Sequence, residues 1–246
     1  IKSQEYLEES LTLLGKDTSK NRLRISNVLT HLGMVYRKLG DYQRAKDLLE
    51  EGMKIYHTYF PHHYTEIAQA ARYLGMIHKS LGNYDKAKEL FEESLNIYKS
   101  HLNEKKQGFA WSLGSLGVVY RKLGKYEEGK ELLEESLKIY RNKFPGNHGG
   151  RAWTLTHLGR IYICLGKYEK AKELFEESLN IYKTHLSNNN VRISWVLAPL
   201  GIVYRELGDY KKAESLMHQS LEIYSQNLSA DHISIIWVTA HLGVVN

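Results

Sequence analysis

The side chains in this sequence that are best suited to chemistry are its tryptophans, which recur at one fixed spacing. The chain has four, each 42 residues after the last: Trp111, Trp153, Trp195 and Trp237. Each occupies the same place in a stretch with helical periodicity, such as "FAWSLGSLGVVYRKLGKY", on the side opposite to the Leu and Gly stripe that marks the buried face. A recessed surface lined by aromatic side chains is typical of a protein-binding site.

Basic side chains fall on the same helix face as the tryptophans. They recur at neighbouring helical positions, with one methionine among them: Arg37, Lys38, Arg72, Met76, Lys79, Arg121, Lys122, Arg160 and Arg205. Glu206 is the acid that accompanies them, and the whole chain carries a net charge of +6. Because arginine and aromatic residues are enriched at the energetic centres of interfaces, this face is predicted to bind a partner with acidic residues and one large apolar anchor.

No combination of residues in the sequence indicates catalysis. The twelve histidines form no zinc-protease pattern, and the nearest group, His57, His62 and His63, surrounds a proline-containing loop. No nucleophilic side chain stands at a spacing that would pair it with a base. We therefore expect a protein that is not an enzyme and that needs neither a metal ion nor a cofactor.

The elements that must position these side chains repeat every 42 residues. Leu-Gly pairs mark the repeat, and their glycines are Gly33, Gly75, Gly117, Gly159, Gly201 and Gly243. The first repeat predicts two amphipathic helices, Arg24 to Leu39 and Tyr42 to Tyr56, separated by Gly40, where glycine can adopt the left-handed conformation that ends a helix. One helix pair cannot bury its own apolar face, so consecutive pairs must stack as a solenoid.

The residues that recur in every unit resemble the tetratricopeptide repeat. In the first unit they are Leu32, Gly33, Tyr36, Gly40, Tyr42 and Ala45. The 42-residue step is similar to the longer repeat of kinesin light chains and of many bacterial repeat proteins, whereas the usual repeat has about 34 residues. The resemblance covers the whole chain and implies an all-α fold, a right-handed superhelical solenoid of antiparallel helix pairs. It also implies that the first helix of each pair lines a concave groove that binds peptide segments.

We expect the whole chain, residues 1–246, to be one such array. Five repeats are predicted near residues 24–65, 66–107, 108–149, 150–191 and 192–233, with a half repeat at each end. The apolar helix at the C-terminal end predicts that the array continues in a longer protein. No apolar run reaches the roughly 18 residues of a membrane span. With no visible signal peptide and a single cysteine, Cys164, a cytoplasmic location is expected.

Two other functions fit the same residues. A single-stranded nucleic acid could bind the basic face and stack its bases on the tryptophans, or the array could be a structural spacer that self-associates through its ends. The tryptophans could also be structural, each packing under the preceding loop against residues such as Phe60 and Phe144. The salt dependence of binding distinguishes nucleic-acid binding from peptide binding, because phosphate binding weakens steeply as the salt concentration rises.

Pro199 is the residue that departs from the local rules of its helix. It lies inside the fifth first helix and cannot donate an N–H to the carbonyl of Trp195. The helix from Arg192 to Leu207 is therefore predicted to bend or to lose a hydrogen bond near Trp195, unlike the equivalent helix from Gly150 to Leu165. Over the chain, eleven or twelve helices and no strand are predicted, with the Leu-Gly pairs buried between the helices of each repeat.

Overall fold

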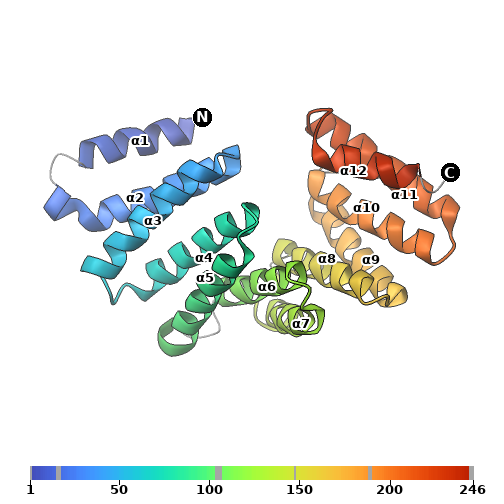
Figure 1. Cartoon of the computed structure of the whole chain (residues 1–246), viewed down its shortest axis with the longest axis horizontal. Coiled ribbons are helices and arrows are strands. Elements are labelled where there is room, and N and C mark those ends of the chain that lie inside the picture. The colour runs from blue at the N-terminus through green and yellow to red at the C-terminus, as the bar shows by residue number, and fades with distance from the viewer. Residues whose placement is uncertain (1, 15–17, 103–106, 147, 188–189, 244–246) are drawn as a thin grey trace. The chain divides into compact units, whose positions relative to one another are not determined.

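The computed structural model describes residues 2–14, 18–102, 107–146, 148–187 and 190–243 (Figure 1). Within these ranges the chain forms twelve α-helices, one five-residue π-helical segment and no strand. The elements are α1 (Lys2–Leu14), α2 (Thr18–Leu39), α3 (Tyr42–Tyr59), α4 (Tyr64–Ser80), α5 (Tyr84–Ile97), η2 (Tyr98–Leu102), α6 (Gln107–Lys122), α7 (Tyr126–Lys143), α8 (His148–Cys164), α9 (Tyr168–His185), α10 (Val191–Glu206), α11 (Tyr210–Asn227) and α12 (Ile233–Leu242). The prediction of an all-α fold is confirmed. None of the described helices combines the length and the apolar character needed to cross a bilayer.

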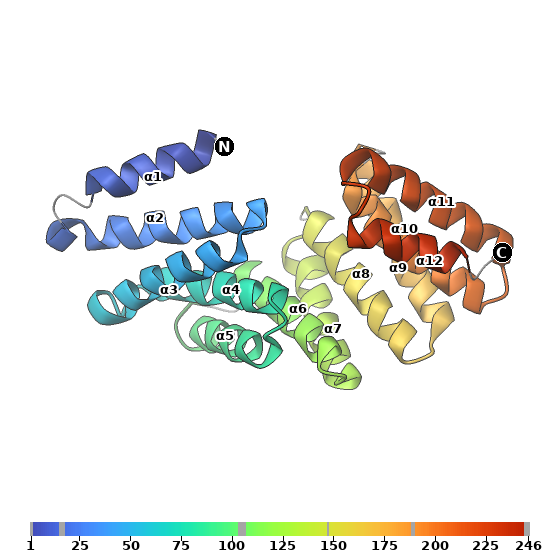
Figure 2. The same cartoon turned by 45° about the horizontal axis from the view of Figure 1, so that its top comes forward.

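The helices form two compact units, called unit 1 (Ile1–Gly124) and unit 2 (Lys125–Asn246) below. The first helices of the repeats are α2, α4 and α6 in unit 1, and α8, α10 and α12 in unit 2. Within a unit, a first helix packs against the second helix that follows it, as α2 does on α3 and α8 does on α9 (Figure 2). Second helices also pack against the next first helix, as α3 does on α4 and α9 does on α10. This stacking of helix pairs is the repeat architecture that the 42-residue period predicts.

The Leu-Gly pairs of the complete repeats lie where the two helices of a repeat approach each other closely. A Cβ atom on Gly159 would lie 2.9 Å from the ring of Phe175, and one on Gly201 would lie 2.8 Å from Met217 Cγ. Only glycine permits this approach. At the far end of each first helix, Gly40 and its four equivalents have φ angles between +69° and +85°, the left-handed region in which glycine ends a helix without strain.

The helices extend beyond the limits that the apolar pattern indicates. α2 begins at Thr18 rather than near Arg24, and α3 continues to Tyr59 rather than ending at Tyr56. The added first turn of α2, with Ser19, Lys20 and Asn21 among its residues, is polar. Hydrophobic periodicity does not predict such a turn, because it detects only the stretch of helix that faces a core.

Successive repeats are joined by a tyrosine on a first helix and a glutamate on the second helix before it. The hydroxyl of Tyr162 donates a hydrogen bond to Glu134 at 3.1 Å, and Tyr120 donates to Glu92 at 3.4 Å. The same bond forms in two more repeats, by the pairs Tyr36–Glu8 and Tyr204–Glu176. A buried or half-buried phenol therefore gains a charged acceptor at four of the repeat junctions.

One repeat junction has a histidine in place of the tyrosine. His78 on α4 is 6% exposed, and its Nε2 lies 4.0 Å from Oε1 of Glu50, too far for a hydrogen bond. Neither ring nitrogen has a hydrogen-bond partner among the described residues. Burial lowers the pKa of His78, and the nearby Glu50 charge only partly opposes this. This junction in unit 1 is thus less well satisfied than the others.

Candidate binding surfaces

The tryptophans lie on the first helices, on the side away from the Leu-Gly pairs, and this side is called the first-helix face below. Trp195 and Trp237 keep 40% and 41% of their surface exposed, whereas Trp111 and Trp153 are half-buried. Trp195 and Trp237 are therefore not core side chains packed under a loop. The side chains around the tryptophan in unit 1 differ from those around the tryptophans in unit 2.

In unit 1, Trp111 is covered by an arginine from the neighbouring first helix. The guanidinium carbon of Arg72 lies 5.0 Å from the centre of the Trp111 ring and 4.5 Å from the centre of the Tyr73 ring. A cation over an aromatic face contributes about 0.5–1 kcal/mol at an exposed site. Two side chains that were predicted to face a partner thus contact each other within the chain itself.

In unit 2, two tryptophans open onto a cavity of about 340 Å³. Helices α8 to α12 all contribute to its wall, which consists of Trp153, Thr156, His157, Arg160, Tyr182, Trp195, Tyr224 and Ser234. The ring of Trp153 meets His157 edge to face, with the ring centres 4.3 Å apart. A mostly aromatic wall with one arginine suits a large apolar group that carries or neighbours a negative charge.

Arg160 is held at this cavity by a backbone carbonyl that lacks its usual helical donor. α10 contains Pro199, which has no N–H to offer the carbonyl of Trp195 four residues before it. Nη2 of Arg160 donates a hydrogen bond to that carbonyl at 3.2 Å. The helical hydrogen bond that the sequence predicts to be absent near Trp195 is therefore replaced by a side chain from α8. This bond ties Arg160 to the backbone of a tryptophan in the cavity wall.

The tyrosines in the wall of this cavity were not anticipated as site residues. Tyr182 and Tyr224 lie near the ends of the second helices α9 and α11, and both are buried. Burial raises the pKa of Tyr182 from the ordinary 10.0 to about 12. Their recurrence every 42 residues is visible in the sequence. Only the packing shows that they reach beneath the first helices to the cavity.

Unit 1 carries a row of cations at one repeat position, called the cation row below. Arg37, Lys79 and Arg121 stand 42 residues apart on α2, α4 and α6, and all three are half-buried. α4 contacts both α2 and α6, so the three helices are neighbours. Burial, reinforced by the positive charges of Arg37, Arg121 and Lys122, lowers the pKa of Lys79 to about 8.

The cation row has no acidic partner within the part of the chain that the structure describes. The Nε–H groups of Arg37 and Arg121 are buried there and donate to no neighbour. Burial also lowers the pKa of Arg37. The other predicted residues of unit 1 lie around the row: Lys38 and Lys122 are exposed at the ends of their helices, and Met76 is half-buried on α4.

The equivalent position in unit 2 carries no such row. It holds Ile163 on α8 and Arg205 on α10. Arg205 forms a salt bridge with Glu206 at 2.7 Å, and its Nη1 lies 3.5 Å from Nδ1 of His241. The basic face predicted over the whole chain is therefore assembled in unit 1, whereas in unit 2 Arg205 is paired within the chain.

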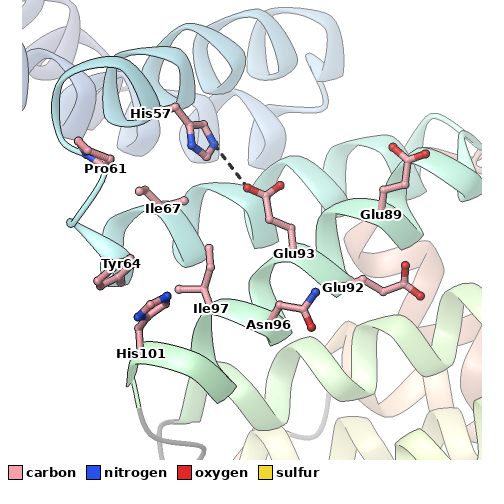
Figure 3. Close-up of a pocket in the computed structure, with 10 residues that line it drawn as sticks. All are labelled: His57, Pro61, Tyr64, Ile67, Glu89, Glu92, Glu93, Asn96, Ile97 and His101. Carbon is pink, nitrogen blue, oxygen red and sulfur yellow. Dashed lines mark ion pairs between the residues drawn. The ribbon is translucent and has the colours of Figure 1, made fainter.

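A larger cavity in unit 1, of about 540 Å³, was not expected from the sequence (Figure 3). It lies between α3, α4 and α5, and Glu89, Glu92 and Glu93 line it. Nε2 of His57 lies 3.4 Å from Glu93, and burial raises the pKa of that carboxyl group. In the described residues, no group of three or more His, Cys, Asp or Glu side chains could hold a metal ion. The charge of this cavity is opposite to that of the first-helix face. The acidic segment that recurs in the second helices was the sequence signal that could have predicted it.

Comparison of the sequence with protein families identifies the repeat. A sequence model described as the tetratricopeptide repeat matches residues 1–58, 24–100, 108–184 and 192–246, which together make up most of the chain. No curated protein matches the chain with significance.

Solved structures match the fold over most of the chain. The crystal structure of BtubC (BKLC) from P. vanneervenii has a TM-score of 0.72 at 21% identity, over 91% of this chain and 89% of that chain. The apo form of the quorum sensor NprR from B. thuringiensis has a TM-score of 0.76 at 17% identity, over 97% and 64%. A putative kinesin light chain from Podosopora anserina with nearly identical TPR-like repeats has a TM-score of 0.65 at 23% identity, over 85% and 99%. At identities below 25%, these structural matches show likeness of fold alone.

Proposed function

Because the chain belongs to the tetratricopeptide repeat family, we propose that it binds a segment of a partner protein on its first-helix face. Members of this family generally mediate protein–protein interactions and are generally not enzymes. The finer proposal is that the segment places one large apolar side chain in the cavity between Trp153 and Trp195, and carries acidic residues beside it.

The cavity of about 340 Å³ in unit 2 is the observation that carries this proposal. Its size lies at the lower end of ligand pockets, and its wall joins exposed indole surface to a fixed positive charge. Trp195 leaves 40% of its surface uncovered, a large apolar area that a partner side chain would remove from water. Arg160 is already oriented by its bond to the Trp195 carbonyl, so less side-chain entropy is lost when a ligand binds.

Selection from a random-sequence peptide library tests the proposal. Peptides are enriched on the wild-type chain and depleted on the Trp153→Ala/Trp195→Ala variant. We expect the survivors to share one large apolar residue near acidic residues. Because an interface tryptophan contributes on the order of 2 kcal/mol or more, Trp195→Ala is expected to weaken their binding about 30-fold or more in a titration calorimeter.

Two controls decide the outcome. Trp111→Ala removes the same side chain at an equivalent position where Arg72 already covers it, and it is expected to leave the affinity for these peptides unchanged. Trp195→Ala must melt close to the wild type, whereas a buried structural tryptophan would cost about 3–5 kcal/mol of stability. Peptides that bind the Trp195→Ala and Trp153→Ala variants as tightly as wild type would refute the proposal. A large fall in melting temperature in both variants would assign the tryptophans to packing.

A further inference from the structure

The spacing of the cation row in unit 1 specifies how the charges of a ligand must be placed. Arg37, Lys79 and Arg121 occupy the same position of three consecutive repeats, on helices that contact one another in sequence. Contacting helices lie about 8–10 Å apart between their axes. The row therefore offers one positive charge for every step of this length.

The free chain leaves part of this row without hydrogen-bond partners. The Nε atoms of Arg37 and Arg121 are buried without a hydrogen-bond partner among the described residues. A half-buried cation without an acidic neighbour is destabilising, because it loses hydration and gains no compensating bond. At the equivalent repeat position of unit 2 the chain avoids this cost, because Arg205 is paired with Glu206. An ordinary solvated face would leave its cations extended into water and not partly buried beside one another.

A peptide in the polyproline II conformation has a matching step. It has three residues per turn and rises about 3.1 Å per residue, so side chains three residues apart lie on one face, about 9 Å from each other. We propose that the cation row binds acidic side chains placed three residues apart on a polyproline II segment of a partner protein. This inference rests on the proposed function and adds to it a spacing rule for acidic segments that bind unit 1. Each repeat then pairs with one carboxylate through charge-assisted hydrogen bonds.

Three synthetic peptides of identical composition test the spacing rule. Each carries three glutamates in a neutral Gly/Ser background without any large apolar residue, and the glutamates are contiguous, three apart or four apart. Binding to the full chain is measured by fluorescence anisotropy of a labelled peptide. We expect the peptide with a spacing of three to bind at least about tenfold tighter than the other two, since only its carboxylates reach all three cations at once. Equal affinity of the three peptides would overturn the inference.

Two charge-matched variants identify the residues. Lys79→Met removes the central cation of the row, and it is expected to weaken the spaced peptide about tenfold or more. Lys54→Met removes an exposed cation from α3, away from the row, and it is expected to leave the affinity within about twofold. Equal losses in both variants would show general attraction to a basic chain and would refute the site. Thermal melting checks that Lys79→Met is folded.

Two further measurements separate this inference from its neighbours. Trp195→Ala is expected to leave the affinity for the spaced peptide unchanged, because the peptide has no apolar anchor. If the spaced peptide did not bind, but library peptides still bound through their apolar residue at Trp195, only the spacing rule would be refuted. A single-stranded oligonucleotide of the same charge is the third probe. If it bound tighter than the spaced peptide, and lost this affinity in Lys79→Met, the row would be a phosphate-binding surface and the inference would be wrong.

Discussion

The first-helix faces of unit 1 and unit 2 are built from the same repeat but present different chemistry. In unit 1 the face gathers the cations Arg37, Lys79 and Arg121, and an arginine covers its tryptophan. In unit 2 the equivalent arginine, Arg205, is paired within the chain, and two of the three tryptophans open onto a cavity. One repeat thus supplies a charged surface in one half of the chain and an aromatic pocket in the other.

Each face also has one local feature that lowers its stability and that the stacking of the helices does not require. In unit 1 the cost is the crowding of like charges around Lys79, and in unit 2 it is the proline that removes a helical hydrogen bond from Trp195. Departures from the rules of stable folding are expected at functional sites, where the sequence is also selected for binding. The comparison therefore predicts that relieving each cost stabilises its unit and damages its binding surface.

The largest expected effect is at Lys79. A pKa of about 8 in the folded chain, against 10.5 for an ordinary lysine, means that the unfolded chain binds more protons between these values. Stability therefore rises as the pH increases from about 8 towards 10.5, and the full penalty applies below this window. Because one pKa unit is worth about 1.4 kcal/mol, Lys79→Met is expected to stabilise unit 1 at pH 7 by up to about 3 kcal/mol.

Denaturant unfolding measured through Trp111 checks this prediction. The other three tryptophans are replaced by phenylalanine, so that fluorescence reports on unit 1 alone. Lys54→Met is the charge-matched control and is expected to change the free energy of unfolding by less than about 0.5 kcal/mol. A loss of stability in Lys79→Met would mean that the lysine stabilises unit 1, and the contrast between the units would fail.

The second effect concerns the bond between Arg160 and the Trp195 carbonyl. Arg160→Leu leaves that carbonyl without its donor, and a hydrogen bond to a charged group contributes about 1.5–3 kcal/mol. In a Pro199→Ala background, the N–H of residue 199 can donate instead, so the same substitution should cost much less. A double-mutant cycle from urea unfolding of unit 2 is expected to give a coupling energy of roughly 1–2 kcal/mol. Additive effects would show that the two residues act independently.

The smallest effect is at the repeat junction that lacks the tyrosine. His78→Tyr is expected to stabilise unit 1 by about 1 kcal/mol, because the phenol can donate to Glu50 as its equivalents do to their glutamates. The lowered pKa of His78 adds a sign test. The unfolded chain protonates this residue more readily, so wild-type stability falls as the pH drops through the ordinary value of 6.5, and the variant should lose this dependence.

Glu50→Ala provides the control for this junction. In that background His78→Tyr has no carboxylate to reach, and the gain in stability should disappear. A gain of the same size with and without Glu50 would attribute it to apolar burial alone.

Much of the fold follows from the sequence because repetition makes the pattern unambiguous. The Leu-Gly pairs and Gly40 with its equivalents recur without any insertion, and each requires a close helix contact or a left-handed turn that only glycine supplies. The sequence also predicts which helix face carries the tryptophans and basic residues, because helical periodicity assigns every side chain a direction. Helix ends were harder to place, because polar first turns such as that of α2 carry no apolar signal.

Periodicity assigns a side chain to a face but says nothing of its partner there. The sequence has Arg72 before Trp111 and Thr156 at the equivalent position before Trp195. Only the structure shows that the arginine covers its indole and that Trp195 stays open to a cavity. The pairing of Arg205 with Glu206 and the bond from Arg160 to a carbonyl freed by Pro199 depend on rotamers and on contacts between helices. The sequence by itself determined the helices, their period and the direction of each side chain, because these depend on local spacing. The tertiary structure alone decided which charges and rings remain available, because availability depends on neighbours brought close only when the repeats stack.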